Sequence, residues 1–180
     1  MAEITREELL ARYAAGERDF SKLDLGWIDL SEADLSGANF TQARLGRSKL
    51  SGANLSKAIF CRANLNSITA ENTNFSDADL SGAQITYASL SGAVFIRANL
   101  YSAYLSESNL TRVNFEGAIL KNVCLIAAGL IDVNLKGADI EGVEVDDETV
   151  LSGTKYWEAT NYIISGIDDF IVGKGDGSEE

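Results

Sequence analysis

Hydroxyl and carboxylate side chains recur along the chain in short runs that would suit a hydrolytic site. Asp-Leu-Ser stands at 34–36 and 79–81, and Asn-Leu-Ser stands at 54–56. A serine nucleophile needs a neighbouring base, yet the 180 residues include no histidine. These runs return at multiples of five residues, which indicates turn residues of a repeat rather than one catalytic group. We therefore expect a non-catalytic protein without catalytic residues.

Metal and cofactor chemistry has as little support in the sequence. Without histidine, the usual ligand sets for zinc, haem and non-haem iron are missing. The two cysteines, Cys61 and Cys124, are far apart in the repeat and are predicted to be free thiols. No glycine-rich phosphate loop is present. We expect no metal, no cofactor and no small-molecule substrate.

A strict five-residue period organises the chain from Phe20 to Val145. Of the 26 positions at multiples of five in this stretch, 25 are Leu, Phe, Ile or Val, and Ala70 is the exception. A small residue, usually alanine, stands two positions earlier, and Asp, Asn, Ser, Thr and Gly fill the positions between. A period of five fits neither an amphipathic helix nor an ordinary strand. The chain is therefore expected to turn every five residues.

The phenylalanines indicate how many of these units make one coil, by which we mean one full turn of the chain. Six of the seven recur at intervals of twenty residues, as Phe20, Phe40, Phe60 and Phe75, Phe95, Phe115. Four units per coil and 26 units give about 6.5 coils, a rod roughly 30 Å long at the interstrand spacing of about 4.8 Å.

The unit Ala-(Asp/Asn)-Leu-Ser-Gly, seen at 33–37 and 78–82, resembles the pentapeptide-repeat family over residues 18–145. The resemblance implies an all-β solenoid, a right-handed quadrilateral β-helix. The segment from Arg6 to Phe20 is similar to the leader of cyanobacterial-type members. In gyrase-binding members the C-terminal segment joins two rods end to end, which implies a homodimer as one expectation for this chain.

A solenoid buries its core by stacking, so both of its ends need caps. Thr5-Arg6-Glu7-Glu8 is a capping box and Gly16 is placed to end a helix, so residues 1–17 are predicted to be a capping segment with a short helix at 5–15. Residues 146–172 are expected to be a C-terminal cap or dimerisation segment with a short helix opening at Thr154, and 173–180 a disordered tail. The side chains expected in the C-terminal cap or dimer contact are Tyr156, Trp157, Tyr162, Ile163 and Phe170.

One side of the predicted rod differs from the others when outward residues are superposed at a period of twenty. It carries Trp27, Arg44, Arg47, Tyr87, Tyr104 and Ile126. Aromatic residues and arginine are enriched at interaction hot spots, so this side is the candidate protein-binding face. Singly exposed apolar residues are also normal on protein surfaces, and a scattered surface is the alternative interpretation.

The net charge of −12 admits a second function, because some family members inhibit DNA gyrase with an acidic rod that mimics DNA. The distribution of charge argues against it: residues 18–145 hold 11 basic and 14 acidic residues, whereas 146–180 hold two basic and nine acidic residues. We expect an acidic protein-interaction or scaffold and regulatory protein with an unidentified protein partner, and a DNA-mimicking gyrase binder is the alternative. Direct nucleic-acid binding is not expected. No signal peptide or membrane span is evident, which predicts a cytoplasmic protein.

Overall fold

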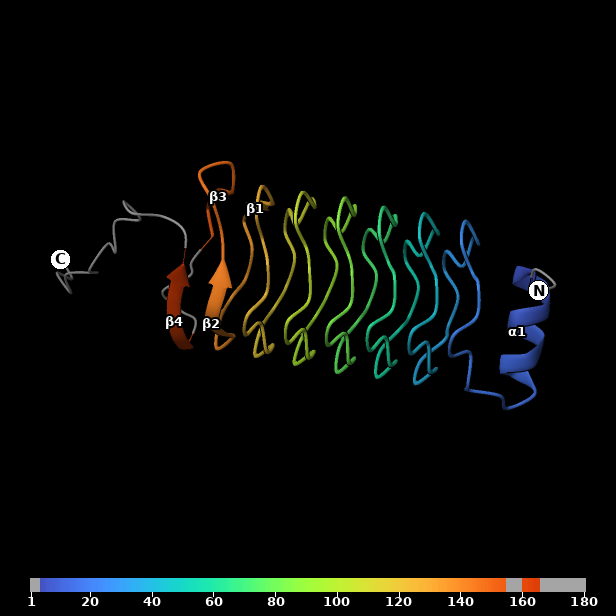
Figure 1. Ribbon diagram of the computed structural model, residues 1–180. Helices are drawn as coiled ribbons and strands as arrows, with labels where there is room; N and C mark the ends of the chain where they lie inside the picture. Colours follow the sequence, from blue (N-terminus) through green and yellow to red (C-terminus); the bar gives the residue numbers. More distant parts are fainter. Residues whose placement is uncertain (1–3, 155–159, 166–180) are drawn as a thin grey trace, which may run out of the picture.

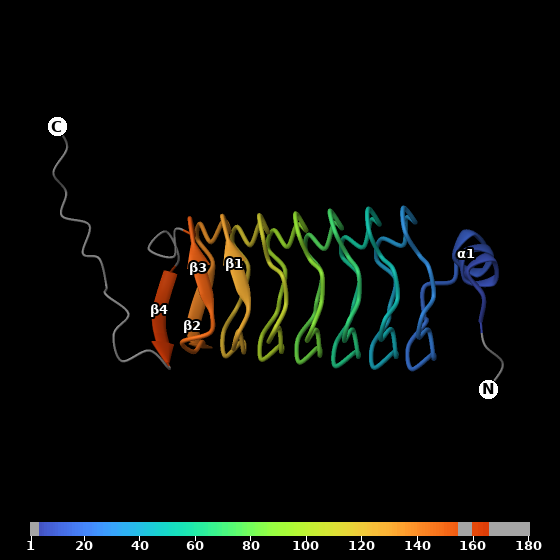
Figure 2. The ribbon, with the colours of Figure 1, turned by 90° about the horizontal axis from the view of Figure 1, so that it is seen from above.

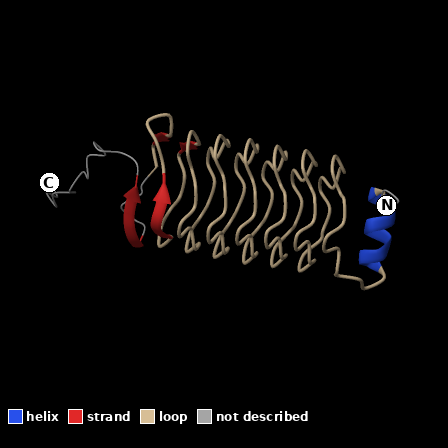
Figure 3. Cartoon of the chain, viewed as in Figure 1, coloured by secondary structure: helices blue, strands red, loops and turns tan. Residues whose placement is uncertain are grey.

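The computed structural model describes residues 4–154 and 160–165, and these form a rod of stacked coils. Helix α1 (Arg6–Ala14) lies across one end, and strands β2 (Asp139–Glu144) and β4 (Thr160–Ser165) lie at the other (Figures 1 and 2). Strands β1 (Gly129–Ile131) and β3 (Val150–Ser152) also belong to the C-terminal end. Between these ends the chain consists of turns joined by single bridging residues (Figure 3).

Every coil takes twenty residues, as the phenylalanine spacing predicts. Parallel bridges join residues twenty apart, beginning with Asp19 and Asn39 and continuing to Cys124 and Glu144. In each bridge the backbone N–H groups donate to carbonyls of the adjacent coils, as when Leu35 donates to Asn54 at 2.9 Å. The C-terminal strands continue the same parallel pairing, β1 with β3 and β2 with β4. The coils therefore satisfy most of one another's backbone groups along the rod.

The core is a column of large apolar residues from the five-residue positions, closed at the sides by alanines. Phe20, Phe40 and Phe60 stack with ring centroids 5.7 and 5.1 Å apart. A second stack is formed by Phe75, Phe95 and Phe115, with separations of 4.8 and 5.2 Å. Phe60 meets Phe75 edge to face at 5.9 Å, so the two stacks join into one aromatic column inside the rod.

The predicted N-terminal helix is confirmed, and it caps the first coil. The Thr5 hydroxyl accepts the N–H of Glu8 at 3.2 Å, which satisfies one free donor of the first turn. Leu9 is fully buried against the core. The Arg6 guanidinium donates to the carbonyl of Asp29 at 2.6 Å, and the Tyr13 hydroxyl donates to the carbonyl of Ser36 at 2.8 Å. These contacts hold α1 across the open end of the solenoid.

The predicted C-terminal helix is wrong where the structure can be compared with it. Residues 160–165, which include Tyr162 and Ile163, form strand β4 and pair in parallel with β2. This pairing satisfies backbone groups at the edge of the last regular coil, which a helix would leave free. Tyr156, Trp157, Phe170 and the predicted tail at 173–180 lie outside the described residues.

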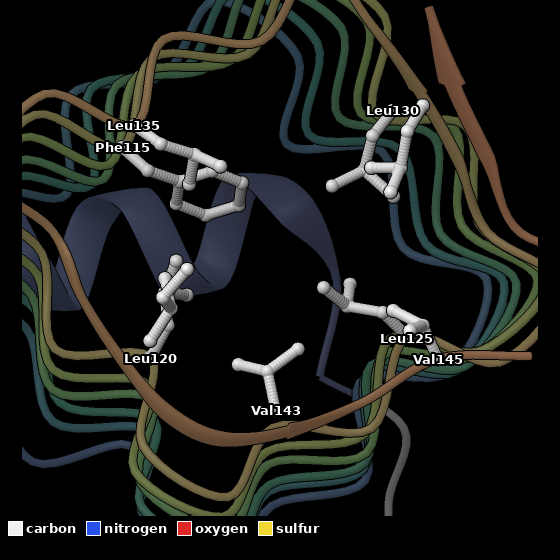
Figure 4. A pocket seen from close by; sticks show the side chains of 9 residues that line it. Phe115, Leu120, Leu125, Leu130, Leu135, Val143 and Val145 are labelled. Atoms are coloured by element: carbon white, nitrogen blue, oxygen red, sulfur yellow. The ribbon is translucent and has the colours of Figure 1, made fainter. Parts of the chain in front are cut away.

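An apolar space remains inside the C-terminal end of the rod (Figure 4). It measures about 30 Å³ and is lined by side chains that include Phe115, Val143 and Val145. Small-molecule sites usually measure hundreds of cubic ångströms, so this space is a packing gap rather than a ligand site.

Within the described part of the chain, no helix is long and apolar enough to cross a membrane.

Two buried serines occupy equivalent positions three coils apart but differ in their hydrogen bonding. The Ser108 hydroxyl donates to the carbonyl of Ile85 at 2.7 Å and accepts the N–H of Ala88 at 3.0 Å. The Ser48 hydroxyl is equally buried, and no described residue pairs with it. A buried polar group without a partner costs free energy, because it has given up its hydrogen bonds to water.

This difference predicts opposite effects of the same substitution. Ser48→Ala should raise the free energy of unfolding by about 1 kcal/mol, because it removes an unpaired hydroxyl. Ser108→Ala should lower it by about 1–2 kcal/mol, because two buried backbone groups lose their partner. Urea denaturation of the two variants and the wild type measures both changes. Equal destabilisation by the two substitutions would contradict this account of Ser48.

Candidate protein-binding face

The candidate face consists of three columns of outward residues, related by twenty, that begin at Asp24, Gly26 and Trp27. The bridges that run from Asp24 through Arg44 to Tyr104 and Cys124 place the first column in register along the rod. The structure thereby brings all six residues predicted from the sequence onto one side. These are Trp27, Arg44, Arg47, Tyr87, Tyr104 and Ile126.

A repeated turn explains why these side chains point outward. In the first unit of the face, the Asp24 carboxylate accepts the N–H of Gly26 at 3.3 Å, closing a side-chain turn. The next residue, Trp27, then takes a left-handed backbone with φ of 66°, and Arg47 and Tyr87 do the same with φ of 62° and 59°. Such a conformation costs roughly 1–2 kcal/mol for a residue with a side chain, which the coil-to-coil hydrogen bonds must offset.

Trp27 and its neighbours form the N-terminal half of the face. The Trp27 side chain is 70% exposed, and the Arg47 guanidinium lies over its ring, 4.9 Å from the centroid. Arg44 pairs with Asp24 through a nitrogen–oxygen distance of 2.7 Å. The N–H of Gly26, and secondly Arg44, hold the pKa of Asp24 below its usual value. This half therefore presents an aromatic ring beside two arginines.

Tyr87, Tyr104 and Ile126 form the C-terminal half of the face, with exposed fractions of 60, 52 and 39%. The nearby carboxylate of Glu107 raises the pKa of the Tyr87 hydroxyl, because it is a hydrogen-bond acceptor and carries negative charge. Four aromatic side chains are highly exposed in the described structure, and three of them lie on this face. The fourth, Tyr101, lies on another side of the rod, so the exposed aromatic residues are concentrated on one face rather than scattered.

Two hollows lie along the same face. A search of the sequence for large or charged outward side chains does not reveal them. The first lies where α1 meets the first two coils, and Ile4, Trp27, Arg44 and Gly46 are among the residues that line it. The second lies between Asn66, Gln84, Thr86 and Tyr104. A sequence signal for the first hollow exists, because Gly26 and Gly46 stand twenty residues apart where the repeat usually has Ser or Thr.

The other sides of the rod hold paired and unpaired charges and isolated apolar residues. Arg97 pairs with Asp77 at 2.8 Å, and Lys121 pairs with Glu141 at 2.6 Å, each with a residue twenty positions away. Ile59 and Ile119 are exposed but lie three coils apart in one column. These sides offer neither a cluster of aromatic residues nor a continuous row of unpaired carboxylates.

Across residues 4–154 and 160–165, no three His, Cys, Asp or Glu side chains are grouped so that they could hold a metal ion. Cys61 and Cys124 are free thiols, and each contacts a serine hydroxyl of a neighbouring coil.

Several carboxylates of the coils should make stability depend on pH. Turn and ion-pair hydrogen bonds lower the pKa values of Asp19, Asp24, Asp29, Asp77 and Asp146 in the folded protein. A lowered folded pKa adds stability above the unfolded value of about 3.9, and this stability is lost as the pH falls through the folded pKa values. Thermal unfolding should therefore be insensitive to pH from about 7 to 5 and should shift to lower temperature below about pH 4.

The Asp77→Asn variant provides the matched comparison for this pH dependence. It keeps the shape of the side chain but removes the charge that binds Arg97. Its melting temperature should fall less between neutral and acid pH than that of the wild type. Identical pH profiles for the two proteins would show that this pair contributes nothing to acid sensitivity.

The architecture is that of a parallel β-solenoid protein with four-sided coils of twenty residues. The sequence model of the family described as pentapeptide repeats matches residues 19–67, 73–112 and 108–144, which is well over half of the chain. The protein therefore belongs to the pentapeptide repeat family, whose fold is a right-handed quadrilateral β-helix. Members of this family are typically non-catalytic. No curated protein matches the sequence significantly.

Solved structures of pentapeptide repeat proteins are similar to this chain. HetL of the cyanobacterium Nostoc sp. strain PCC 7120, involved in heterocyst differentiation regulation, is 24% identical, with 87% of this chain and 94% of HetL covered and a TM-score of 0.38. Rfr23 of the cyanobacterium Cyanothece 51142 is 26% identical, with 79 and 96% covered and a TM-score of 0.33. QnrB1, a plasmid-mediated fluoroquinolone resistance protein, is 19% identical, with 83 and 82% covered and a TM-score of 0.45.

Proposed function

We propose that this protein is a non-catalytic interaction protein of the cytoplasm, with a scaffold or regulatory role, and that the candidate face binds a protein partner. The observation that carries the proposal is the gathering of exposed Trp27, Tyr87 and Tyr104 with two arginines on one side of the rod. Aromatic residues and arginine supply most of the binding energy in protein interfaces.

The construction of the rod favours binding by a preformed surface. Residues of the face are fixed to a neighbouring coil by backbone hydrogen bonds, as in the donation from Arg47 to Asn66 at 2.8 Å. Trp27 is further held by the guanidinium of Arg47. A surface that is already ordered loses little conformational entropy when a partner binds. We therefore expect the partner to adapt to the rod, rather than the rod to the partner.

A homodimer through the C-terminal segment is part of the proposal. The last coil ends in an apolar core that includes Val143 and Val145, and β4 adds a further strand there. The predicted contact residues are Tyr156, Trp157, Tyr162, Ile163 and Phe170. Sedimentation equilibrium of the full chain and of the Trp157→Ala, Phe170→Ala double variant tests it. A monomer at all concentrations of the wild type would remove the dimer from the account.

The competing proposal is a DNA-mimicking binder of DNA gyrase, which requires a regular row of unpaired negative charges. The coils of this protein do not present such a row at Asp24, Asp29 and Asp77, because each of these carboxylates lies beside an Arg or Lys of a neighbouring coil. A supercoiling assay with purified gyrase should accordingly show no inhibition at stoichiometric amounts of this protein. Inhibition at those amounts would favour the DNA mimic and overturn the preference for the aromatic face.

Affinity capture with the immobilised full chain tests the interaction directly. Extract of the source organism is passed over the wild type, over a Trp27→Ala, Tyr87→Ala double variant and over a Tyr101→Ala control. The proposal predicts a protein that is retained by the wild type and the control but is lost with the double variant. A retained protein that binds all three equally would place the interaction on another side of the rod.

A further inference from the structure

Among the described residues, three backbone N–H groups in the Gly26 column of the candidate face have no acceptor, those of Gly46, Ser106 and Ile126. The Gly46 N–H is the one of the three that has an arginine on each side in the sequence. In the coil before it, the Gly26 N–H donates to the Asp24 carboxylate, and in the coil after it, the Asn66 N–H donates to the Asn64 side chain at 3.0 Å. The corresponding donor in the coil between them is Gly46, and the position of the acceptor is held by Arg44, which has no oxygen to offer. No residue of the described structure accepts the Gly46 N–H.

The surroundings of Gly46 leave this donor open on its outer side. Glycine has no side chain to cover it, and Arg44 extends away from it toward Asp24. Gly46 also lines the hollow between α1 and the first coils, together with Leu25, Trp27 and Ile28. The unpaired N–H thus belongs to a residue of a recess that is lined by both apolar and polar side chains.

Two arginines flank the same donor in the sequence, and the recess beside it is lined by Asp24 and Asp29 as well as by Arg6 and Arg44. Arg44 stands two residues before Gly46 and Arg47 follows it directly. Arg47 forms no ion pair with a residue of 4–154, and its guanidinium is held in place by the Trp27 ring. An N–H donor that is followed directly by an arginine without an ion pair is suited to a carboxylate, because hydrogen bonds to an ionised acceptor are about twice as strong as neutral ones.

We propose that an Asp or Glu side chain of the protein partner binds at Gly46, where it completes the turn that Arg44 leaves without an acceptor. Its carboxylate accepts from the Gly46 N–H and from Arg47, as the Asp24 carboxylate accepts from Gly26 and Arg44 in the preceding coil. An apolar residue next to the acid in the partner occupies the recess against Trp27 and Ile28. The proposal names the partner's chemistry, an acidic and apolar peptide segment, and rests on the proposed protein-binding function.

A nuclear magnetic resonance titration tests this site without knowledge of the partner. The full-length protein, labelled with ¹⁵N, is titrated with acetyl-Asp-Leu-Leu-amide and separately with acetyl-Asn-Leu-Leu-amide and with acetate. The aspartyl peptide should shift the Gly46 amide and the Trp27 indole signals in a saturable way. Its affinity should be about tenfold higher than that of the asparaginyl peptide or of acetate, since only it offers both the charge and the apolar contact.

Two substitutions of Arg44 separate the effect of filling the turn acceptor from the effect of removing the positive charge on peptide binding. Arg44→Asn supplies the missing acceptor within the chain, as Asn64 does for Asn66, and should weaken the aspartyl peptide at least about tenfold. Arg44→Leu also removes the guanidinium but supplies no acceptor, and it should weaken binding less. Lys49→Asn is the matched control, because it adds the same acceptor five residues further along, and it should leave the affinity within about twofold.

The outcomes distinguish this site from the proposed function. Absence of a saturable Gly46 shift, equal binding of the Asp and Asn peptides, or equal effects of Arg44→Asn and Lys49→Asn would overturn the carboxylate site. A shift by acetate as strong as that by the peptide would overturn the peptide as its occupant. If captured partner binding depends on Trp27 but is unchanged by Arg44→Asn and Arg47→Ala, the face binds protein without this site. The proposed function then stands and this inference fails.

Discussion

Replacing Phe95 by alanine should lower the free energy of unfolding by about 3–5 kcal/mol. Phe95 is fully buried and stacks between Phe75 and Phe115, with ring centroids 4.8 and 5.2 Å away. The cavity would lie in the middle of the rod, where the stacked coils above and below cannot move together without breaking their backbone pairing. The loss should therefore approach the upper end of the range for an aromatic residue.

Urea denaturation followed by circular dichroism measures this loss. Ile59→Ala is the control, because Ile59 points outward from the same solenoid and is 39% exposed. It should change the free energy of unfolding by no more than about 0.5 kcal/mol. If Phe95→Ala and Ile59→Ala destabilise the protein equally, the aromatic column does not hold the rod together as we describe.

Replacing Trp27 by alanine should weaken binding of the captured partner by about thirtyfold or more, as for a residue at the centre of an interface. Trp27 offers the most exposed aromatic surface among the described residues, and Arg47 loses its support when the ring is removed. The loss of the Trp27 ring and of the support for Arg47 removes an ordered contact surface and no part of the core. The melting temperature should accordingly remain close to that of the wild type.

The affinity is measured by isothermal titration calorimetry with the purified partner. Tyr101→Ala provides the control, since Tyr101 is comparably exposed on a different side of the rod, and it should alter the affinity less than about threefold. A thirtyfold loss with Tyr101→Ala and none with Trp27→Ala would move the binding surface away from the candidate face.

The fold could be predicted from the sequence because one physical rule is repeated in every unit. A large apolar residue at each fifth position, with a turn residue beside it, leaves the backbone few possible conformations. The interval of twenty residues between phenylalanines then indicates how many residues form one coil. Strand β4 could not be predicted in this way. Its apolar residues at 160–165 have no five-residue period, and a short apolar run suits a helix or a strand equally. The neighbouring edge of β2 decides between them.

The position of the face was accessible from the sequence, whereas its detailed chemistry was not. Once the coil takes twenty residues, Trp27, Tyr87 and Tyr104 must lie on the same side. The sequence does not show that α1 closes one end of a hollow beside Trp27, because that depends on how the helix docks. Nor does it show that Arg44 turns toward Asp24 and leaves the Gly46 N–H open, because side-chain direction follows from packing between coils.

Site-specific photocrosslinking in the source organism tests the central claim, that this one face binds a protein, most directly. A photoreactive benzoyl-phenylalanine is placed at Tyr87, on the face, and in a second strain at Tyr101, on another side of the rod. The account predicts that light produces a covalent adduct with a distinct protein from position 87 and not from position 101. Adducts from position 101 alone, or the same adducts from both positions, would contradict it.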